Sequence, residues 1–450
     1  MSADSRYLET RHHELRKTRL MLVDGNLTTN LRTSQAGISA RAYHAGYWGF
    51  ASAPADGNGA QERVRGQALA NARAMAGFGT QPALHLPGEH ARHEQPRHGR
   101  AALAASEVAE RMAELHAWCM ARYPGLRSTR VMATDEDHLK QLRTDGGGES
   151  LARIQRAAVY VVMIGEDDQG TPIELSEVIS GIGSLADIDW SLASLQPALD
   201  RLHGHLQAKR HAVPARGGEQ IVVLSPDLSG MLAHEAMGHP CEADAVLSGA
   251  VTADLRDRPV ASELITMVDL AHHWNGQELM CPVYVDDEGT PARDVTMIER
   301  GVLRQFMHSR ETAARLGLPP SGNARAYGPD DEPLVRMRNT AILPGTQSLD
   351  ALVAGVEDGY LLLDTSNGQA DATTEFMFGV NLGYEIRNGQ LGRAIRDTTL
   401  SGSALKVLSS VDGVGSDMKW SCNGYCGKKQ PMVVSVGGPS LRARAHLGGE

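Results

Sequence analysis

The segment Leu232–His239 constrains the fold of this chain most, because it carries two histidines five residues apart and a glutamate directly after the first. Zinc hydrolases of the His-Glu-x-x-His type hold their metal with two histidines one helical turn apart, and the adjacent glutamate serves as the base. On a regular α-helix, residues five apart point about 140° away from each other. His234 and His239 can therefore share a metal only where the helix widens, as in a single π-type turn, or where it ends between them.

The residues on either side of this segment predict a rigid support for it. The apolar run Gln220–Leu224 is typical of a buried strand. Ser225–Asp227 then begins a helix, with a capping hydroxyl, a proline in the first turn and an early acidic residue. Gly238 weakens that helix just before the second histidine, and Pro240 comes directly after it. We therefore expect a strand that leads into a helix, with the metal ligands at the end of the helix.

A metal held by two imidazoles needs at least a third ligand. Glu242 follows the second histidine by three residues, so it is placed either to bind the metal or to hydrogen-bond a ligand. Cys422 and Cys426 lie in a glycine-containing segment beside Lys428 and Lys429, and nearby positive charge favours the thiolate form that binds metal. On this chemistry alone, Cys426, Cys422 and Glu242 are nearly equal candidates.

The composition narrows the class of protein. The chain has 450 residues, enough for two domains, and its 42% of hydrophobic residues suffices for a buried core. A net charge of −10 argues against binding to the phosphate backbone of nucleic acids. No apolar run reaches the roughly 18 residues that span a membrane, and the polar segment Met1–Lys17 does not resemble a signal peptide. The five scattered cysteines do not suggest a disulfide framework, so we expect a cytoplasmic protein.

The spacing of apolar residues predicts an α+β fold with two domains. Strand-like alternation covers much of residues 18–60. Helical spacing follows over three segments: Gln61–Gly77, Ala101–Arg122 and Trp190–Lys209. Separate strand-like runs lie between the last two: Thr129–Thr134, His138–Leu142, Arg156–Ile164 and Pro172–Ile179. Pro214–Gly218 resembles a hinge, so we place a mixed α/β amino-terminal domain at residues 1–215 and a strand-rich domain with the metal-bearing helix at residues 216–450.

Further motifs accompany the histidine segment in a fixed order along the second half of the chain. They are Asp286–Pro291, Pro320–Asn323, Arg338–Thr340, Leu343–Gly345, Gly368–Asp371, Cys426–Lys428 and Val436–Leu441. Together with the His-Glu-x-x-x-His segment, this series resembles the metal-bearing TldD branch of the TldD/PmbA family, once described as modulators of DNA gyrase. The PmbA-like branch lacks the His-Glu motif. The resemblance covers nearly the full length and is weaker in the amino-terminal part.

This resemblance implies a cytosolic zinc metalloprotease. Its metal ligands would be His234, His239 and Cys426, with the family's following acid at Glu242. Glu235 would take a proton from the attacking water and deliver it to the leaving amine. The resemblance also implies that the substrates are peptides or unfolded polypeptides, and that the chain pairs with a PmbA-like partner or with itself. An extended peptide could dock by adding to an exposed sheet edge in the strand-rich domain.

Two alternatives belong to other functional classes. A non-catalytic partner or regulatory subunit would hold a structural metal with four protein ligands, the fourth supplied by Cys422 or Glu242. Binding to gyrase or DNA is disfavoured by the acidic composition. If the chain is an enzyme, developing oxyanion charge needs a stabilising group. By residue type alone, the sequence offers four candidates for that role: Arg336, Arg338, Asn339 and His308.

Overall fold

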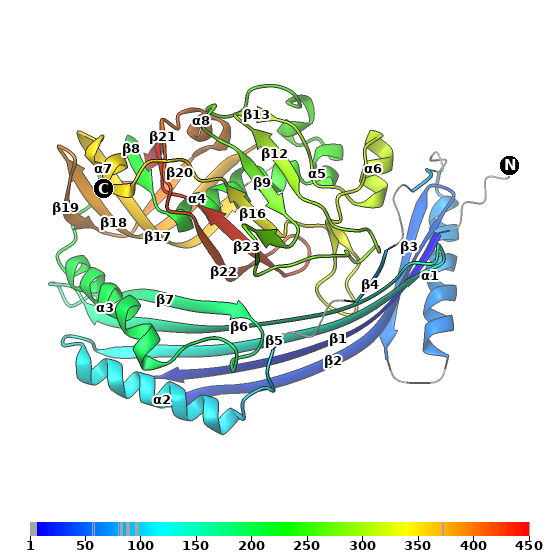
Figure 1. The fold of residues 1–450 in the computed structure, drawn as a ribbon, viewed down its shortest axis with the longest axis horizontal. Coiled ribbons are helices and arrows are strands. Elements are labelled where there is room, and N and C mark those ends of the chain that lie inside the picture. Colours follow the sequence, from blue (N-terminus) through cyan, green and yellow to red (C-terminus); the bar gives the residue numbers. More distant parts are fainter. Residues whose placement is uncertain are drawn as a thin grey trace.

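A computed structural model of the chain describes residues 7–449, apart from residues 56, 58, 80, 82, 83, 87–90, 95–98, 371 and 372. One long curved sheet lies along one side of the molecule, and a more compact body of shorter strands lies on the other side (Figure 1). Strands and helices are mixed in both parts, which confirms the predicted α+β class. The boundary at residue 215 stays a prediction, and it falls between helix α3 (Leu192–Lys209) and strand β8 (Gly218–Leu224).

The long curved sheet is built by the first half of the chain. Its strands follow the order β3-β2-β1-β5-β6-β4, and β7 also pairs with β6. The bounds are β1 Tyr7–Val23, β2 Asn26–His44, β3 Tyr47–Pro54, β4 Arg92–Glu94, β5 Ser128–Thr144, β6 Glu149–Glu166 and β7 Pro172–Ile182. The sequence predicted two separate strands within residues 129–142, whereas β5 runs through both. Polar residues of β5, such as Glu136 and His138, are buried against the second half of the chain, so the strand lacks the expected apolar alternation there.

Three helices cover parts of this sheet. Helix α1 (Ala60–Ala76) packs on β2 and β3, while α2 (Ala105–Arg122) and α3 pack on the face turned away from the second half (Figure 1). The buried stripe of α2 is the one that the helical spacing predicted: Val108, Met112, Leu115 and Cys119. None of the described helices combines the length and the apolar character that a membrane crossing requires.

The opposite face of the long sheet meets the second half through buried polar contacts. Lys140 Nζ on β5 lies 2.8 Å from Asp287 Oδ2, and Arg41 on β2 pairs with Glu288. The hydroxyl of Tyr327 donates a hydrogen bond of 2.6 Å to Glu136. These partners lie in loops that connect short strands of the second half. The two halves are therefore joined by specific charge and hydrogen-bond contacts as well as by packing.

The second half contains two larger sheets with the metal-motif helix between them. One sheet has the order β13-β12-β9-β16-β23-β22, and the other has β17-β8-β24-β20-β18-β19, with β21 paired to β24. The bounds are β9 Met267–Leu270, β12 Val295–Glu299, β13 Val302–Leu303, β16 Asn339–Ile342, β17 Asp358–Ala370, β18 Glu375–Arg387, β19 Gln390–Ile395, β20 Thr398–Ser403, β21 Gly413–Val414, β22 Lys419–Cys426, β23 Met432–Gly438 and β24 Leu441–Leu447. Two short ribbons are β10 His273–Trp274 with β11 Gln277–Glu278, and β14 Ala324–Arg325 with β15 Leu334–Val335.

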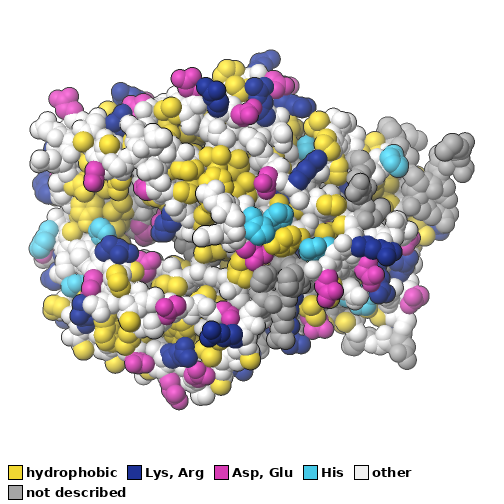
Figure 2. Space-filling view, viewed as in Figure 1, with side chains coloured by type: hydrophobic (Ala, Val, Ile, Leu, Met, Phe, Trp, Pro, Cys, Tyr) yellow, Lys and Arg dark blue, Asp and Glu magenta, His cyan; other side chains and the backbone are white. Residues whose placement is uncertain are grey.

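The described residues of this half also form five short α-helices: α4 Pro226–Met231, α5 Ala243–Leu247, α6 Arg310–Leu316, α7 Leu349–Ala354 and α8 Ala404–Ser409. Helix α4 contacts β22 and β23 of one sheet and β8 and β17 of the other. On the face of the molecule that Figure 2 shows, basic and acidic side chains of the described residues are interspersed and do not form a continuous basic stripe.

Candidate metal centre

Strand β8 leads directly into the helix that carries the histidine motif. Ser225 caps α4, because its hydroxyl oxygen accepts a hydrogen bond of 3.3 Å from the amide of Leu228. After Met231 the helix widens into a π-helical turn over Leu232–Gly238, and a short 3₁₀ turn over His239–Cys241 follows. The widened turn is one of the two geometries that the five-residue spacing allowed if both histidines were to face one point.

Two glycines let this helix lie close to the neighbouring strands. A Cβ atom on Gly230 would sit 3.0 Å from the backbone nitrogen of Gly437 on β23. A Cβ atom on Gly238 would sit 2.2 Å from Met337 Sδ, well inside van der Waals contact. Gly238 therefore allows Met337 to pack closely beside the second histidine, in addition to loosening the helix. The helix that carries the histidine motif is therefore packed tightly against its neighbours.

The helix and strand β22 bring together the two histidines and a cysteine. The possible ligand atoms of His234, His239 and Cys426 all lie within 4.8 Å of one another. Cys426 Sγ is 3.2 Å from His239 Nε2, and the two imidazole rings are 5.0 Å apart at 78°. His234 is buried and its Nδ1 has no hydrogen-bond partner. Two imidazoles and a thiolate are a donor set that suits zinc, so the residues present fit the metal that the sequence implied.

Glu235 lies at the edge of this cluster. Its Oε2 is 3.8 Å from His239 Nε2, and its side chain keeps 18% of its surface exposed. A carboxylate in this place is close enough to exchange a proton with a molecule held at the cluster. The structure thus puts the predicted base beside the predicted ligands, although their roles remain predictions.

The electrostatics of the cluster favour a thiolate on Cys426 and a protonated ring on His239, so His239 must give up a proton when it binds a metal. Burial alone raises the pKa of Cys426, but hydrogen bonds and charge from His234 and His239 outweigh it and lower the pKa to about 4. Burial lowers the pKa of His239, but the Glu242 carboxylate and Cys426 outweigh it and raise the pKa to about 10. Cys426 is therefore a thiolate at neutral pH, which is the form that binds a metal ion. The sequence had suggested that the neighbouring lysines promote the thiolate, whereas the imidazoles do so.

Glu242 supports the cluster from behind. Its Oε2 accepts a hydrogen bond of 3.1 Å from His239 Nδ1, the ring nitrogen opposite the one that faces Cys426. Lys428 Nζ lies 3.0 Å from the same carboxylate and 2.7 Å from that of Asp244. The Glu242 side chain is only 1% exposed. A carboxylate in this position fixes the orientation and tautomer of a ligating histidine. Of the three near-equal candidates for the third ligand, only Cys426 therefore joins the two histidines, and no sequence pattern predicted the contact between Lys428 and Glu242.

Arg336 fixes the segment that carries the thiol. Its fully buried guanidinium donates hydrogen bonds to the carbonyl oxygens of Cys426 at 2.7 Å, Lys428 at 2.8 Å and Gln430 at 2.9 Å. The neighbouring Tyr425 donates a hydrogen bond of 2.6 Å to Glu136 on the long sheet. The loop that presents the thiol is thus held both from inside the second half and from the first half.

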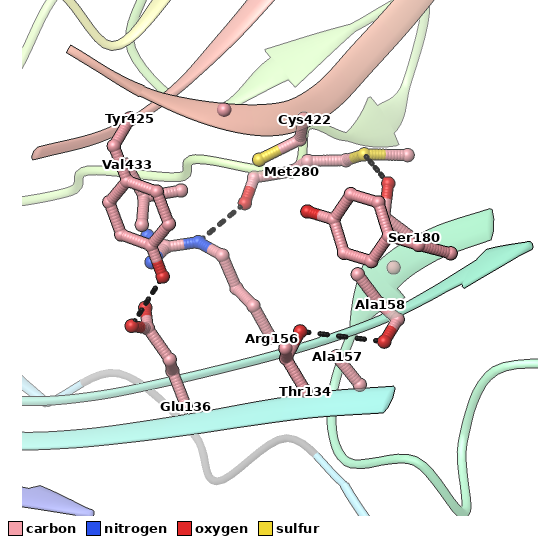
Figure 3. A pocket seen from close by; sticks show the side chains of 13 residues that line it. Thr134, Glu136, Arg156, Ala157, Ala158, Ser180, Met280, Cys422, Tyr425 and Val433 are labelled. Atoms are coloured by element: carbon pink, nitrogen blue, oxygen red, sulfur yellow. Dashed lines mark hydrogen bonds between the residues drawn. The ribbon is translucent and has the colours of Figure 1, made fainter. Parts of the chain in front are cut away.

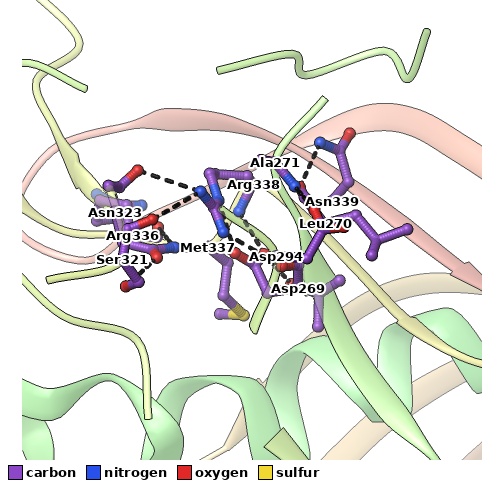
Figure 4. A network of polar contacts seen from close by, with 12 residues as sticks. Asp269, Leu270, Ala271, Asp294, Ser321, Asn323, Arg336, Met337, Arg338 and Asn339 are labelled. Atoms are coloured by element: carbon purple, nitrogen blue, oxygen red, sulfur yellow. Dashed lines mark hydrogen bonds and ion pairs between the residues drawn. The ribbon is translucent and has the colours of Figure 1, made fainter. Parts of the chain in front are cut away.

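The remaining candidates for oxyanion stabilisation also make structural contacts. Arg338 is fully buried, and its Nε lies 2.8 Å from Asp269 Oδ2 in the network of Figure 4. Asn339 donates to the carbonyl oxygens of Leu270 and Cys281, each at 2.9 Å. The buried His308 faces Thr312. Burial and the charges of nearby arginines lower the pKa of His308 to about 4. These contacts explain Arg338 and Asn339 without a catalytic role, whereas the buried Nε2 atom of His308 has no hydrogen-bond partner among the described residues.

Comparisons with known proteins agree with this geometry. Residues 217–447 match the PmbA/TldA metallopeptidase C-terminal domain. The chain is 32% identical over 327 residues to a zinc metalloprotease TldD homolog of Saccharolobus solfataricus, an alignment that covers 72% of this chain and 71% of that protein. It is 33% identical over 330 residues to a metalloprotease of Archaeoglobus fulgidus, covering 72% of this chain and 73% of that protein.

Solved structures extend the similarity to almost the whole fold. TldE from Thermococcus kodakarensis superposes with a TM-score of 0.75 at 16% identity, covering 97% of this chain and 96% of that one. A Thermotoga maritima protein proposed to modulate a DNA gyrase superposes with a TM-score of 0.76 at 19% identity, covering 97% of this chain and 96% of that one. At these identities the superpositions establish a shared two-part fold.

Proposed function

Because this chain belongs to the PmbA/TldD metallopeptidase family, we propose that it is a zinc-dependent peptidase whose metal ligands are His234, His239 and Cys426. The observation that carries the proposal is the convergence of these three side chains within 4.8 Å, with Glu235 beside them: His234 from the π-helical turn, His239 from the 3₁₀ turn after it and Cys426 from strand β22. Zinc in such a site acts as a Lewis acid that makes water more acidic and polarises a peptide carbonyl.

The protein side chains supply the proton transfers. The Glu235 carboxylate takes a proton from the attacking water and delivers it to the nitrogen of the leaving amine. Glu242 holds His239 through Nδ1, so the Nε2 atom stays directed toward Cys426. The oxyanion-stabilising group is then a backbone amide or a side chain other than the arginines of the structural networks, because Arg336 and Arg338 are fully buried in other contacts.

We propose that substrates bind as extended peptides along strand β22. This strand is the last one of its six-stranded sheet, and it ends at Cys426. A peptide that adds to this edge would gain main-chain hydrogen bonds with little sequence preference and would lead its backbone toward the metal ligands. Peptides with N-methylated amides at alternate positions should then be hydrolysed much more slowly than unmodified peptides of the same sequence. Equal rates would exclude strand addition.

We also propose that the active protein is a cytosolic assembly, formed either with a PmbA-like chain or with a second copy of itself. The solved structure of TldE has the same fold as this chain. This similarity supports a pairing of this chain with a related chain. Light scattering on the purified protein, alone and mixed with a PmbA-like chain from the same source, gives the mass of the active species. Hydrolysis by a species with the mass of one chain would contradict this proposal.

The decisive experiment measures zinc content and the hydrolysis of casein-derived peptides on three purified proteins: wild type, Glu235→Gln and Cys426→Ala. We expect about one zinc per chain and hydrolysis for the wild type. Glu235→Gln should keep the zinc and lose the hydrolysis, whereas Cys426→Ala should lose both. Glu299→Gln is the matched control, because the Glu299 side chain is 60% exposed on β12 and should leave zinc and activity unchanged.

The outcomes separate the alternatives. Zinc that is retained without hydrolysis in every preparation, including one with a PmbA-like partner, would mean that the metal is structural and the chain a non-catalytic subunit. Retained hydrolysis in Glu235→Gln would remove this residue as the base. A wild type without zinc that still hydrolyses peptides would refute the metal site altogether.

A further inference from the structure

Two cysteines that the metal centre does not use lie side by side. Cys281 Sγ is 3.6 Å from Cys422 Sγ, and neither forms a disulfide. The residues are 141 positions apart in the chain, so only the tertiary fold brings them together. Cys281 belongs to a loop held by Asn339, whose side-chain oxygen accepts a hydrogen bond of 3.0 Å from the Cys281 amide. Cys422 belongs to β22, the strand that ends at Cys426.

The backbone at Cys422 has room to adjust. Strand β22 pairs regularly with β23 at Ser421 and again at Gly424, and the register shifts between these two residues. Cys422 therefore lies in a bulge, where it lacks a regular partner on β23 and the ladder constrains it less. A small movement of this bulge would bring its sulfur within bonding distance of Cys281 Sγ, because the loop on the other side is held in place.

Cys422 is also within reach of small molecules. It lines a cavity of about 40 Å³ between β22 and strands β6 and β7, beside Arg156, Ser180 and Met280 (Figure 3). A cavity of this size exceeds what one water molecule needs. Cys281, by contrast, is fully buried behind it. Cys422 is thus the sulfur that a small oxidant meets first.

The surroundings favour a thiolate in the pair. Burial raises the pKa of Cys281, but the hydrogen bond with Cys422 and the positive charges of Arg156 and Arg325 outweigh it and lower the pKa to about 6. The pKa of Cys422 is raised, first by the hydrogen bond with Cys281 and then by burial. The pair therefore carries one proton and one negative charge near neutral pH, which is the state in which thiols react with oxidants.

We propose that Cys281 and Cys422 form a redox-active site that a peroxide converts into an intramolecular disulfide and that a small thiol reduces again. The Cys422 thiol gives its proton to the Cys281 thiolate, and its sulfur attacks the peroxide. The O–O bond breaks, which leaves a sulfenic acid on Cys422 and a hydroxide that takes the proton from Cys281. The Cys281 thiolate then attacks the sulfenic sulfur, and the S–O bond breaks as hydroxide leaves. The two sulfurs lose two electrons together, and hydrogen peroxide becomes one water and one hydroxide.

The other cysteines provide internal references. Cys119 lies on the buried face of α2 in an apolar cluster, and burial raises its pKa to about 12. Cys241 is fully buried, and burial raises its pKa as well. Both should stay reduced thiols. The environment of Cys426 also makes it reactive, so it must be distinguished from Cys422 in the analysis. Cys426 directly follows Tyr425, and chymotrypsin cleavage after this tyrosine places Cys422 and Cys426 on different peptides.

The test uses the full-length protein in its zinc-loaded form, treated with hydrogen peroxide, then denatured, alkylated and mapped by mass spectrometry without reduction. We expect a cross-linked peptide pair that contains Cys281 and Cys422, lighter by two hydrogens than the two thiol peptides. The alkylated fraction of these two residues should fall by about tenfold or more, and dithiothreitol should restore it. Cys119 should remain alkylated throughout. The readout does not depend on peptidase activity, so failure here leaves the proposed function untouched.

Two variants sharpen this result. Cys422→Ser should fold, since the substitution is small and the position is only partly buried, and it should abolish the cross-link. Cys119→Ser should leave the cross-link intact. The proposal is overturned if wild-type Cys281 and Cys422 remain separately alkylated after peroxide, or if they are oxidised only to sulfinic or mixed-disulfide forms. A cross-link that joins Cys281 to Cys426 instead of Cys422 would overturn it as well.

Discussion

Substitutions at Glu242 test whether this carboxylate supports the metal centre or binds the metal. Glu242 accepts two charged hydrogen bonds, at 3.1 Å from His239 Nδ1 and at 3.0 Å from Lys428 Nζ. Glutamine in its place still accepts the bond from His239 but removes the negative charge, whereas alanine removes both contacts. Loss of such a supporting group typically weakens metal binding by about 10- to 100-fold.

We therefore expect zinc affinity to fall about tenfold in Glu242→Gln, equal to about 1.4 kcal/mol, and about 100-fold in Glu242→Ala, about 2.7 kcal/mol. Competition against a chromophoric chelator at one neutral pH measures both values. Asp244→Asn is the control, because Asp244 bonds to the same lysine but does not touch the histidine. We expect its zinc affinity to stay within about threefold of wild type.

Two results would refute this reasoning in opposite directions. Wild-type zinc affinity in Glu242→Ala would show that the orientation of His239 does not depend on the carboxylate. A loss in Glu242→Ala as complete as that in Cys426→Ala would show that Glu242 binds the metal itself. Equal losses in Glu242→Gln and Asp244→Asn would assign the effect to Lys428 instead of the histidine.

Three further predictions concern the scaffold. Arg336→Met removes the donor to the buried carbonyl oxygens of Cys426 and Gln430, whereas that of Lys428 still accepts from the Gln430 amide, so the free energy of unfolding, measured with denaturant, should fall by at least about 2 kcal/mol; an unchanged value would contradict this. Gly238→Ala should cost about 1–3 kcal/mol through the clash with Met337, and Met337→Ala in the same chain should relieve part of that cost if the clash is the cause. The pKa of His308 is lowered to about 4, so the buried neutral ring stabilises the fold above pH 6.5, and this contribution is lost as the pH falls from about 6.5 to about 4. Wild type should therefore lose about 3 kcal/mol more than His308→Gln over that range in parallel unfolding curves, and parallel pH profiles would rule this out.

The sequence predicted the local geometry of the motif because the relevant constraints are local. Two histidines five residues apart can face one point only on a widened or broken helix, and Leu232–Gly238 is a π-helical turn. The capping serine and the proline likewise act on the nearest backbone amides, so the start of α4 followed from three consecutive residues. Patterns of this kind need no knowledge of the tertiary fold.

The long strand β5 shows where sequence patterns fail. Its central residues Asp135–Asp137 interrupt the apolar alternation, and the pattern therefore predicted two short strands. In the structure Glu136 is buried and accepts hydrogen bonds from Tyr327 and Tyr425, both at 2.6 Å. A buried polar residue whose partners lie some 190 and 290 positions away leaves no periodic signal. Interfaces between the two halves were for this reason invisible to sequence analysis.

The choice between Cys422 and Cys426 depends on the same long-range information. The two cysteines are four residues apart, and only the pairing of β22 with β23, together with Arg336, decides which sulfur meets the histidines. Tyr425, between them, is tied to Glu136 of the first half. It follows that the first half of the chain helps to position the metal-binding thiol. Glu136→Gln removes the charge but can still accept hydrogen bonds from both tyrosines. The double variant Tyr327→Phe with Tyr425→Phe removes both hydrogen bonds. We therefore expect zinc binding to be weakened less in Glu136→Gln than in the double variant. If chelator competition shows the larger loss of zinc affinity in Glu136→Gln, the charge of Glu136, and not its hydrogen bonds to the tyrosines, supports zinc binding.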